Sequence, residues 1–257
     1  FKFRIQWDVE IHTNKGFLPA EIKLVNSDHW SFLALQKYQK YLSLIVLFKE
    51  LVGQKEIIEH LLKGAGGERI AHAQLFHSSE GSGALATAVA YAGYILCAQR
   101  SQTDACGVCP SCLMVKKLAH PDLHFSFPIT SKKEIPDSDA LLAEFREQFE
   151  LNPWFSYNDW MLSLDAENKQ GIIPVKESER ILRKISLNSF SGGYKILIIW
   201  LPEKMNGQSA NKLLKLLEEP PEKTLFILVT ENEEALLRTI VSRTQLLKFD
   251  RISDAAI

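Results

Sequence analysis

The sequence lacks any long hydrophobic run. The longest, around Leu44 to Phe48, is far shorter than the roughly 20 apolar residues that a helix needs to span a bilayer. The first residues, Phe1 to Lys15, mix charged and aromatic side chains and have neither the apolar core nor the small-residue cleavage site of a signal peptide. These absences argue against a membrane protein and predict a cytoplasmic one.

An excess of charge is missing as well. Thirty Lys and Arg residues face 31 Asp and Glu residues, for a net charge of −1. A dedicated nucleic-acid binder normally carries a marked basic excess, so the composition argues against that class. DNA contact made as one member of a complex stays open. With 46% hydrophobic residues, the 257-residue chain is long enough for one large core or two smaller ones.

Cysteine is scarce and clustered. The chain has four, Cys97, Cys106, Cys109 and Cys112, all within one short segment. In a reducing cytoplasm this clustering favours metal over disulfides. Four thiolates without an open coordination position describe a closed structural zinc site. The alternative, a redox Cys-x-x-Cys motif, predicts two cysteines at a helix start rather than four in one cluster.

The hydrophobic pattern of residues 1–45 differs from that of the rest, and we treat them as an N-terminal extension of unknown role. Alternation over Phe1–Ile11 predicts a half-buried strand, or alternatively a peptide-binding edge. Asn14–Gly16 offers a turn, after which Ala20–Val25 could pair back as a hairpin. Trp30–Leu47 looks helical.

From Phe48 onward, short apolar strands alternate with helices, which predicts an α/β fold with a parallel sheet covered on both faces. Residues 131–171 are polar and irregular, and we interpret them as an insertion. We expect strands at Ala73–Phe76, Leu123–Pro128, Lys195–Trp200, Leu225–Thr230 and Leu246–Phe249, and helices at Gly53–Leu62, Ala84–Leu96, within Ile172–Leu187 and at Ser209–Leu217.

The loop Ser78–Leu85, between the first expected strand and the following helix, has the context of a phosphate-binding loop. Such a loop needs glycines that let backbone N–H groups wrap the phosphates, a lysine for the outer phosphates and a Ser or Thr for magnesium. Gly81 and Gly83 are in place, but Ala84 stands at the lysine position and Leu85 at the hydroxyl position. We predict a degenerate, inactive phosphate loop. A plain glycine-containing turn explains this segment equally well.

The expected strand Lys195–Trp200 carries a second loss. An ATPase strand at this position should end in an acidic residue that holds magnesium or polarises the attacking water. Here the strand ends in Trp200-Leu201, and Glu203 lies beyond Pro202, where we expect it to be too far along to substitute. Both losses predict that ATP is not hydrolysed at this site.

Two later segments complete a pattern. Asn211–Pro221 is an amphipathic helix stopped by two prolines, and Thr239–Thr244 places Arg243 in a loop, where an arginine is usually a solvated surface group. Together the segments resemble clamp-loader AAA+ subunits of bacterial DNA polymerase III, from about Leu47 to the C-terminus without much of the insertion. The resemblance rests on Leu47–Gln54, Ala71–Phe76, the four cysteines, His120–Asp122, Ala210–Pro221 and Thr239–Thr244.

The resemblance distinguishes two subunit types. The tau/gamma type hydrolyses ATP with an intact phosphate loop, whereas the delta-prime type has decayed versions and keeps an arginine that reaches the ATP of the adjacent subunit. Ala84 and Trp200-Leu201 place this sequence with the delta-prime type. Arg243 then matches the arginine finger, a guanidinium that offsets charge on the transferred phosphoryl group. Thr244 departs from the pattern, because the family usually has cysteine there.

The resemblance implies an AAA+ P-loop-type domain at residues 46–250, with a zinc module at 97–112 and the insertion at 131–171. It implies a non-hydrolysing part of the DNA polymerase III holoenzyme that helps load the sliding clamp onto primed DNA, with tau/gamma and delta subunits as partners and structural zinc as cofactor. We expect the lid and collar domains to be missing from this sequence. The alternatives are an active tau/gamma-type ATPase and a zinc-stabilised binding module unrelated to replication.

Overall fold

The computed structural model describes residues 2–5, 9–12, 47–67, 70–130 and 137–252, and divides the chain into two compact units, 1–43 and 44–257. In the first unit, β1 (Lys2–Ile5) pairs antiparallel with β2 (Val9–His12). The expectation of one strand over Phe1–Ile11 is therefore wrong. Apolar and polar residues alternate in both halves of that segment, so each half can form a strand. Pairing these two neighbouring strands closes only a short loop.

The other expectations for the first unit fall outside the described residues. These are the turn at Asn14–Gly16, the strand at Ala20–Val25 and, apart from Leu47, the helix at Trp30–Leu47.

A five-stranded sheet, parallel throughout, forms the centre of the second unit. Its order is β4-β5-β6-β3-β7, with β3 (Ala73–Ser78), β4 (Leu123–Ser126), β5 (Lys195–Trp200), β6 (Thr224–Thr230) and β7 (Gln245–Phe249). Each crossover between parallel strands needs a long connection, and these connections carry the helices. The predicted strands and the fold class, an AAA+ P-loop-type sheet flanked by helices, are confirmed.

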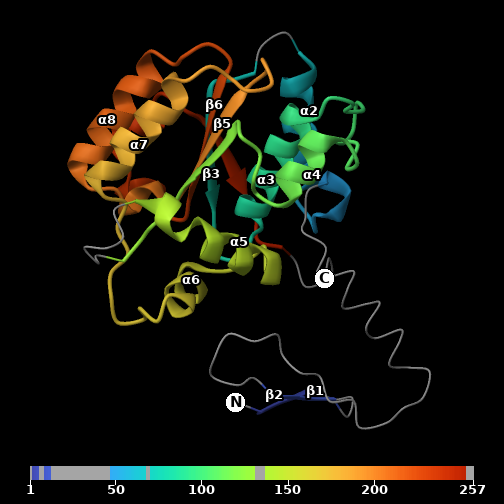
Figure 1. Ribbon diagram of the computed structural model, residues 1–257, viewed down its shortest axis with the longest axis vertical. Coiled ribbons are helices and arrows are strands. Elements are labelled where there is room, and N and C mark those ends of the chain that lie inside the picture. Colours follow the sequence, from blue (N-terminus) through green and yellow to red (C-terminus); the bar gives the residue numbers. More distant parts are fainter. Residues whose placement is uncertain (1, 6–8, 13–46, 68–69, 131–136, 253–257) are drawn as a thin grey trace. The chain divides into compact units, whose positions relative to one another are not determined.

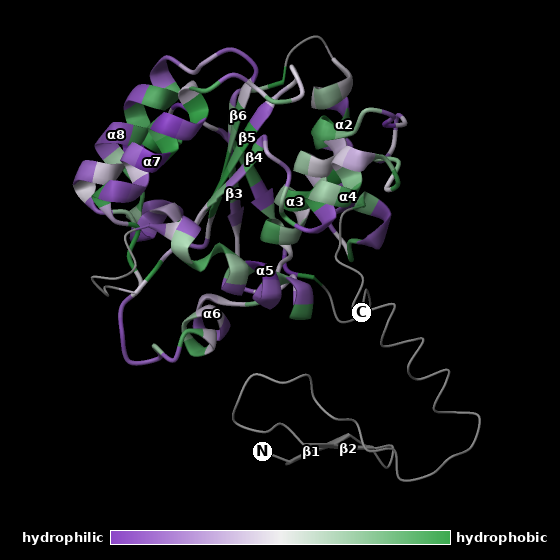
Figure 2. Cartoon of the chain, viewed as in Figure 1, coloured by the Kyte–Doolittle hydropathy of each residue, from purple (hydrophilic) through white to green (hydrophobic). Residues whose placement is uncertain are grey.

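Helices cover both faces of this sheet (Figure 1). One face carries α2 (Lys55–Gly66), α3 (Ala84–Leu96) and α4 (Pro110–Lys116), and the other carries α7 (Val175–Ser186) and α8 (Gly207–Glu218). Successive strand residues point to opposite faces. Ile196 and Ile198 thus pack on the α3 side, whereas Leu197 and Ile199 pack with α7 and α8. Figure 2 shows the result: β5 and β6 are apolar and lie between the two helical layers, and the outer sides of α7 and α8 are polar.

The insertion is more regular than its sequence suggested. Within it, the structure has η2 (Ser138–Leu141), α5 (Leu142–Leu151) and α6 (Tyr157–Ser163), so the expectation of an irregular segment is wrong. A capping box between Ser156 and Asp159 starts α6. Phe145 and Trp160 are fully buried, and this packing stabilises helices whose remaining surface is polar.

The remaining described elements are short. They are η1 (Phe48–Glu50), η3 (Pro202–Lys204), η4 (Glu233–Ala235) and α9 (Arg238–Val241). No helix among the described residues is both long and apolar enough to cross a membrane.

Candidate functional site

The loop between β3 and α3 contains both glycines of the predicted phosphate-binding loop. Gly81 has a φ of 74° and Gly83 a φ of 80°, both in the left-handed region that favours glycine. Helix α3 then begins at Ala84, and the first N–H groups of a helix have no intrahelical partner. The two predicted glycines therefore lie where a phosphate cradle would need them.

The two substituted positions face the protein interior. Ala84 and Leu85 are 3% and 6% exposed and belong to the core between α3 and the sheet. Every residue of α3 is buried, as its small and apolar composition requires. At these positions the loop offers neither an ammonium group nor a hydroxyl group to a phosphate.

Trp154, in the connection between α5 and α6, lies against the loop. A Cβ atom added to Gly83 would lie 2.8 Å from Trp154 Nε1 and 3.2 Å from its Cδ1. The loop and the segment Pro153–Phe155 leave between them a cavity of only about 20 Å³. That is room for about one water molecule, whereas ligand pockets measure roughly 300–1,000 Å³. The insertion therefore fills the cradle.

An aromatic cluster covers the end of β5, where an ATPase would carry its acidic residue. Trp200 packs edge-to-face on Phe155 of the insertion, with ring centroids 4.9 Å apart. Leu201 follows with 1% exposure. The cluster comprises Phe127, Phe145, Phe155, Trp160 and Trp200. The predicted absence of an acid at this strand end is accompanied by apolar packing from the insertion.

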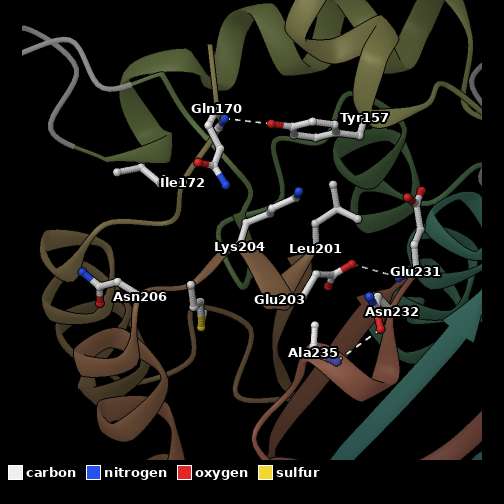
Figure 3. A pocket seen from close by; sticks show the side chains of 12 residues that line it. Tyr157, Gln170, Ile172, Leu201, Glu203, Lys204, Asn206, Glu231, Asn232 and Ala235 are labelled. Carbon is white, nitrogen blue, oxygen red and sulfur yellow. Dashed lines mark hydrogen bonds between the residues drawn. The ribbon is translucent and has the colours of Figure 1, made fainter.

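Glu203 is engaged elsewhere. Its carboxylate accepts hydrogen bonds from Thr230 Oγ1 at 2.8 Å and from the Glu231 amide at 3.1 Å, so it caps the end of β6. Figure 3 shows it in a pocket of about 440 Å³, into which Lys204 extends toward the ring of Tyr157. The Lys204 Nζ lies 4.5 Å from the centre of that ring. Burial, followed by the charges of Glu203 and Glu80, raises the pKa of Glu231 to about 7.

The four cysteines meet at one point next to α4. Their sulfur atoms all lie within 4.8 Å of one another, with Cys97 to Cys109 and Cys106 to Cys112 both at 3.9 Å. A tetrahedral zinc with Zn–S bonds of about 2.3 Å places its sulfurs about 3.8 Å apart. The geometry fits the ion that the sequence predicted.

Backbone amides surround these sulfurs. Cys97 Sγ accepts from the amides of Gln99 and Cys106, and Cys109 Sγ accepts from that of Cys112. Hydrogen bonds from the amides of Val108 and Cys109 lower the pKa of Cys106 to about 6, whereas burial raises the pKa of Cys112. Amide donors of this kind favour thiolates, the form that binds metal.

Arg243 lies just after α9 and contacts the end of α8. Its Nη2 is 2.7 Å from Glu218 Oε1, and its Nη1 donates to the Thr239 carbonyl at 3.0 Å. The side chain is 36% exposed. The structure thus brings together the two segments, Asn211–Pro221 and Thr239–Thr244, that carry much of the resemblance. Sequence reasoning missed Glu218 and Trp154, and the only signal for Trp154 was the aromatic density of the insertion.

The five-stranded parallel sheet, its flanking helices and the loop between β3 and α3 form an AAA+ P-loop-type domain, in which Ala84 and Leu85 follow the second glycine of that loop. The chain belongs to the family described as DNA polymerase III, delta subunit, whose family model matches residues 53–253. It is therefore of the clamp-loader type, and the resemblance to delta-prime subunits is confirmed by the relatives that it matches.

Two of these relatives are DNA polymerase III delta-prime subunits. The chain is 29% identical to that of Bacillus subtilis over 79% of its own length and 50% of the relative's, and 30% identical to that of Yersinia pestis over 76% and 44%. It is 25% identical to the tau subunit of Bacillus subtilis over 82% of the chain and 30% of the relative. The chain spans about half the length of the delta-prime relatives.

Among solved structures, a gamma subunit-related protein of Thermotoga maritima matches with a TM-score of 0.41 and 16% identity. The match covers 75% of this chain and 45% of that one.

Proposed function

We propose that this chain is a delta-prime-type clamp-loader subunit that does not hydrolyse ATP and that supplies Arg243 to the ATP site of a neighbouring subunit. In this role it helps to place a sliding clamp on primed DNA. Family membership supports the clamp-loader setting. The observation that carries the proposal is the position of Trp154 against Gly83, which leaves about 20 Å³ in the phosphate cradle.

Two features argue against ATP hydrolysis in this chain: the groups that phosphoryl transfer needs are missing, and Trp154 occupies the space of the phosphates. Phosphoryl transfer depends on cations and magnesium that neutralise the phosphate oxygens, and on a residue that orients the nucleophile. Ala84, Leu85 and Trp200 stand at the positions where the tau/gamma type carries such groups, and all are buried in the core. A bound nucleotide would also have to displace Trp154.

Arg243 has the exposure and the donors that a group acting on a neighbour needs. A guanidinium has five N–H donors in a planar fork that matches phosphate oxygens. The contacts with Glu218 and Thr239 engage one N–H on each η nitrogen. Within the described part of the chain, these contacts leave the Nε–H and a second N–H on each η nitrogen for a phosphate of the adjacent subunit.

The cysteine cluster would hold zinc as a structural ion. Cys97 ends α3, Cys109 caps α4, and Cys106 and Cys112 complete the set, so the ion would join the ends of two helices. When bound, it supplies a cross-link that a small loop cannot otherwise provide. All four ligand positions are sulfurs, which leaves no open position for chemistry.

The partners that follow from this proposal are tau/gamma and delta subunits, the clamp and, through the complex, primed DNA, all in the cytoplasm. The test is equilibrium binding of Mg-ATP to the isolated chain by calorimetry, together with ATP turnover. We expect neither binding at millimolar nucleotide nor hydrolysis. Tight binding with turnover would instead identify an active ATPase of the tau/gamma type.

A further inference from the structure

Glu218 and Arg243 form an ion pair between two separate elements. Glu218 is the last residue of α8, and Arg243 follows α9. We propose that Glu218 is a positioning residue for Arg243: its carboxylate orients the guanidinium so that the remaining donors point outward to a phosphate of the adjacent subunit. This inference rests on the proposed function of Arg243.

The contacts restrain the guanidinium from two sides. The Thr239 carbonyl accepts from Nη1 at 3.0 Å, and Glu218 Oε1 lies 2.7 Å from Nη2. Thr239 lies in α9, four residues before Arg243, so its contact with Nη1 ties the guanidinium only to its own segment of the chain. Glu218 adds a fixed point from α8, which itself packs on the sheet through Leu213 and Leu217.

The physical advantage is preorganisation. An arginine side chain has many rotamers, and it loses this rotamer entropy when it takes up a single position on a phosphate. A side chain that is already held loses less on binding. The carboxylate contact leaves the outward donors free, so it orients the guanidinium without occupying it fully.

Stability of the fold is a poor explanation for the pair. The two side chains are 36% and 49% exposed, and solvent-exposed ion pairs of this kind contribute little to the stability of a fold. Glu219, the next residue, is also exposed, but no ion pair between it and Arg243 occurs in the described part of the chain. Glu219→Gln is therefore a matched control for Glu218→Gln.

The test uses full-length protein assembled with the other loader subunits, the clamp and primed DNA. We expect Glu218→Gln to lower kcat for ATP roughly two- to fivefold with KM unchanged, the range that the loss of a partly exposed ion pair allows. Glu219→Gln should match wild type. Because salt screens the pair, the difference between wild type and Glu218→Gln should narrow as ionic strength rises.

A double-mutant cycle separates the possible failures. If Glu218 acts through Arg243, adding Glu218→Gln to Arg243→Ala changes turnover no further. An equal loss in both backgrounds, or an increase in turnover for Glu218→Gln alone, would overturn the positioning role. The positioning role would also be overturned if Arg243→Ala lowers turnover but Glu218→Gln has the turnover of wild type. If Arg243→Ala itself leaves turnover unchanged, the proposed function of Arg243 fails, and this inference fails with it.

Discussion

The indole of Trp154 occupies the space in front of Gly83, so close that a Cβ atom on the glycine would lie 2.8 Å from Nε1. In an active phosphate loop, the backbone at such a glycine approaches a phosphate instead. In this protein, the absence of a side chain on Gly83 makes room for the ring of Trp154 instead. The packing of Trp154 therefore requires glycine at position 83.

Gly83→Ala should destabilise the fold more than Gly81→Ala. Both residues have positive φ, which costs a non-glycine residue about 1–2 kcal/mol. A Cβ on Gly81 would meet nothing within 4 Å, whereas one on Gly83 would meet Trp154. We expect a further loss of about 1–3 kcal/mol for Gly83→Ala from this overpacking, measured by urea unfolding.

Trp154→Ala provides the control for that difference. In the Trp154→Ala background the extra cost of Gly83→Ala over Gly81→Ala should disappear, because the clashing ring is gone. A difference that persisted without the indole would contradict the contact. Trp154→Ala alone should cost about 1–3 kcal/mol and should not restore ATP turnover, since Ala84 and Trp200 remain.

Zinc should be bound at one ion per chain and should stabilise the domain. Cys112→Ser removes a buried ligand, so we expect loss of tightly bound zinc by elemental analysis. At free zinc 1,000-fold above Kd, the lost stabilisation amounts to about 4 kcal/mol. Ser111→Ala, in the same turn of α4, should retain both zinc and stability. Wild-type protein that holds no zinc after purification without chelators would contradict the site.

Glu231→Gln should stabilise the protein at neutral and alkaline pH but not at pH 4. The pKa of Glu231 is raised to about 7 in the folded chain, so the fold disfavours its charged form. Wild-type stability is therefore lost as pH rises from about 4.3, the unfolded pKa, through 7. We expect equal melting temperatures at pH 4 and an advantage for the variant of about 2–4 °C at pH 8, for a difference on the order of 1 kcal/mol. A constant difference across this range would exclude the carboxyl as its cause.

Much of the second unit could be predicted from its sequence. The strand at Lys195–Trp200 and the helix at Ala84–Leu96 have the predicted bounds, because each is a mostly apolar segment that follows turn-forming residues. The cysteine cluster could also be predicted, because Cys106, Cys109 and Cys112 lie close together in the sequence. The hairpin of the first unit was misjudged, because alternation gives the period of a strand but not its partner.

The contacts of the insertion could not be predicted. Its polar composition concealed two helices that are held by a few buried aromatic residues, such as Phe145 and Trp160. Trp154 and Gly83 are distant in the sequence, and no local sequence pattern around either residue predicts that they lie next to each other. The same holds for the ion pair of Glu218 with Arg243.

The most direct test of the account is the ATP turnover of a loader assembled with full-length Arg243→Ala protein, the clamp and primed DNA. Arg238→Ala, an exposed arginine of α9, serves as the matched control. We predict that Arg243→Ala lowers turnover at least about tenfold with assembly intact, while Arg238→Ala has little effect. Turnover equal to wild type in an intact Arg243→Ala assembly would contradict the role of Arg243 at a neighbour's ATP.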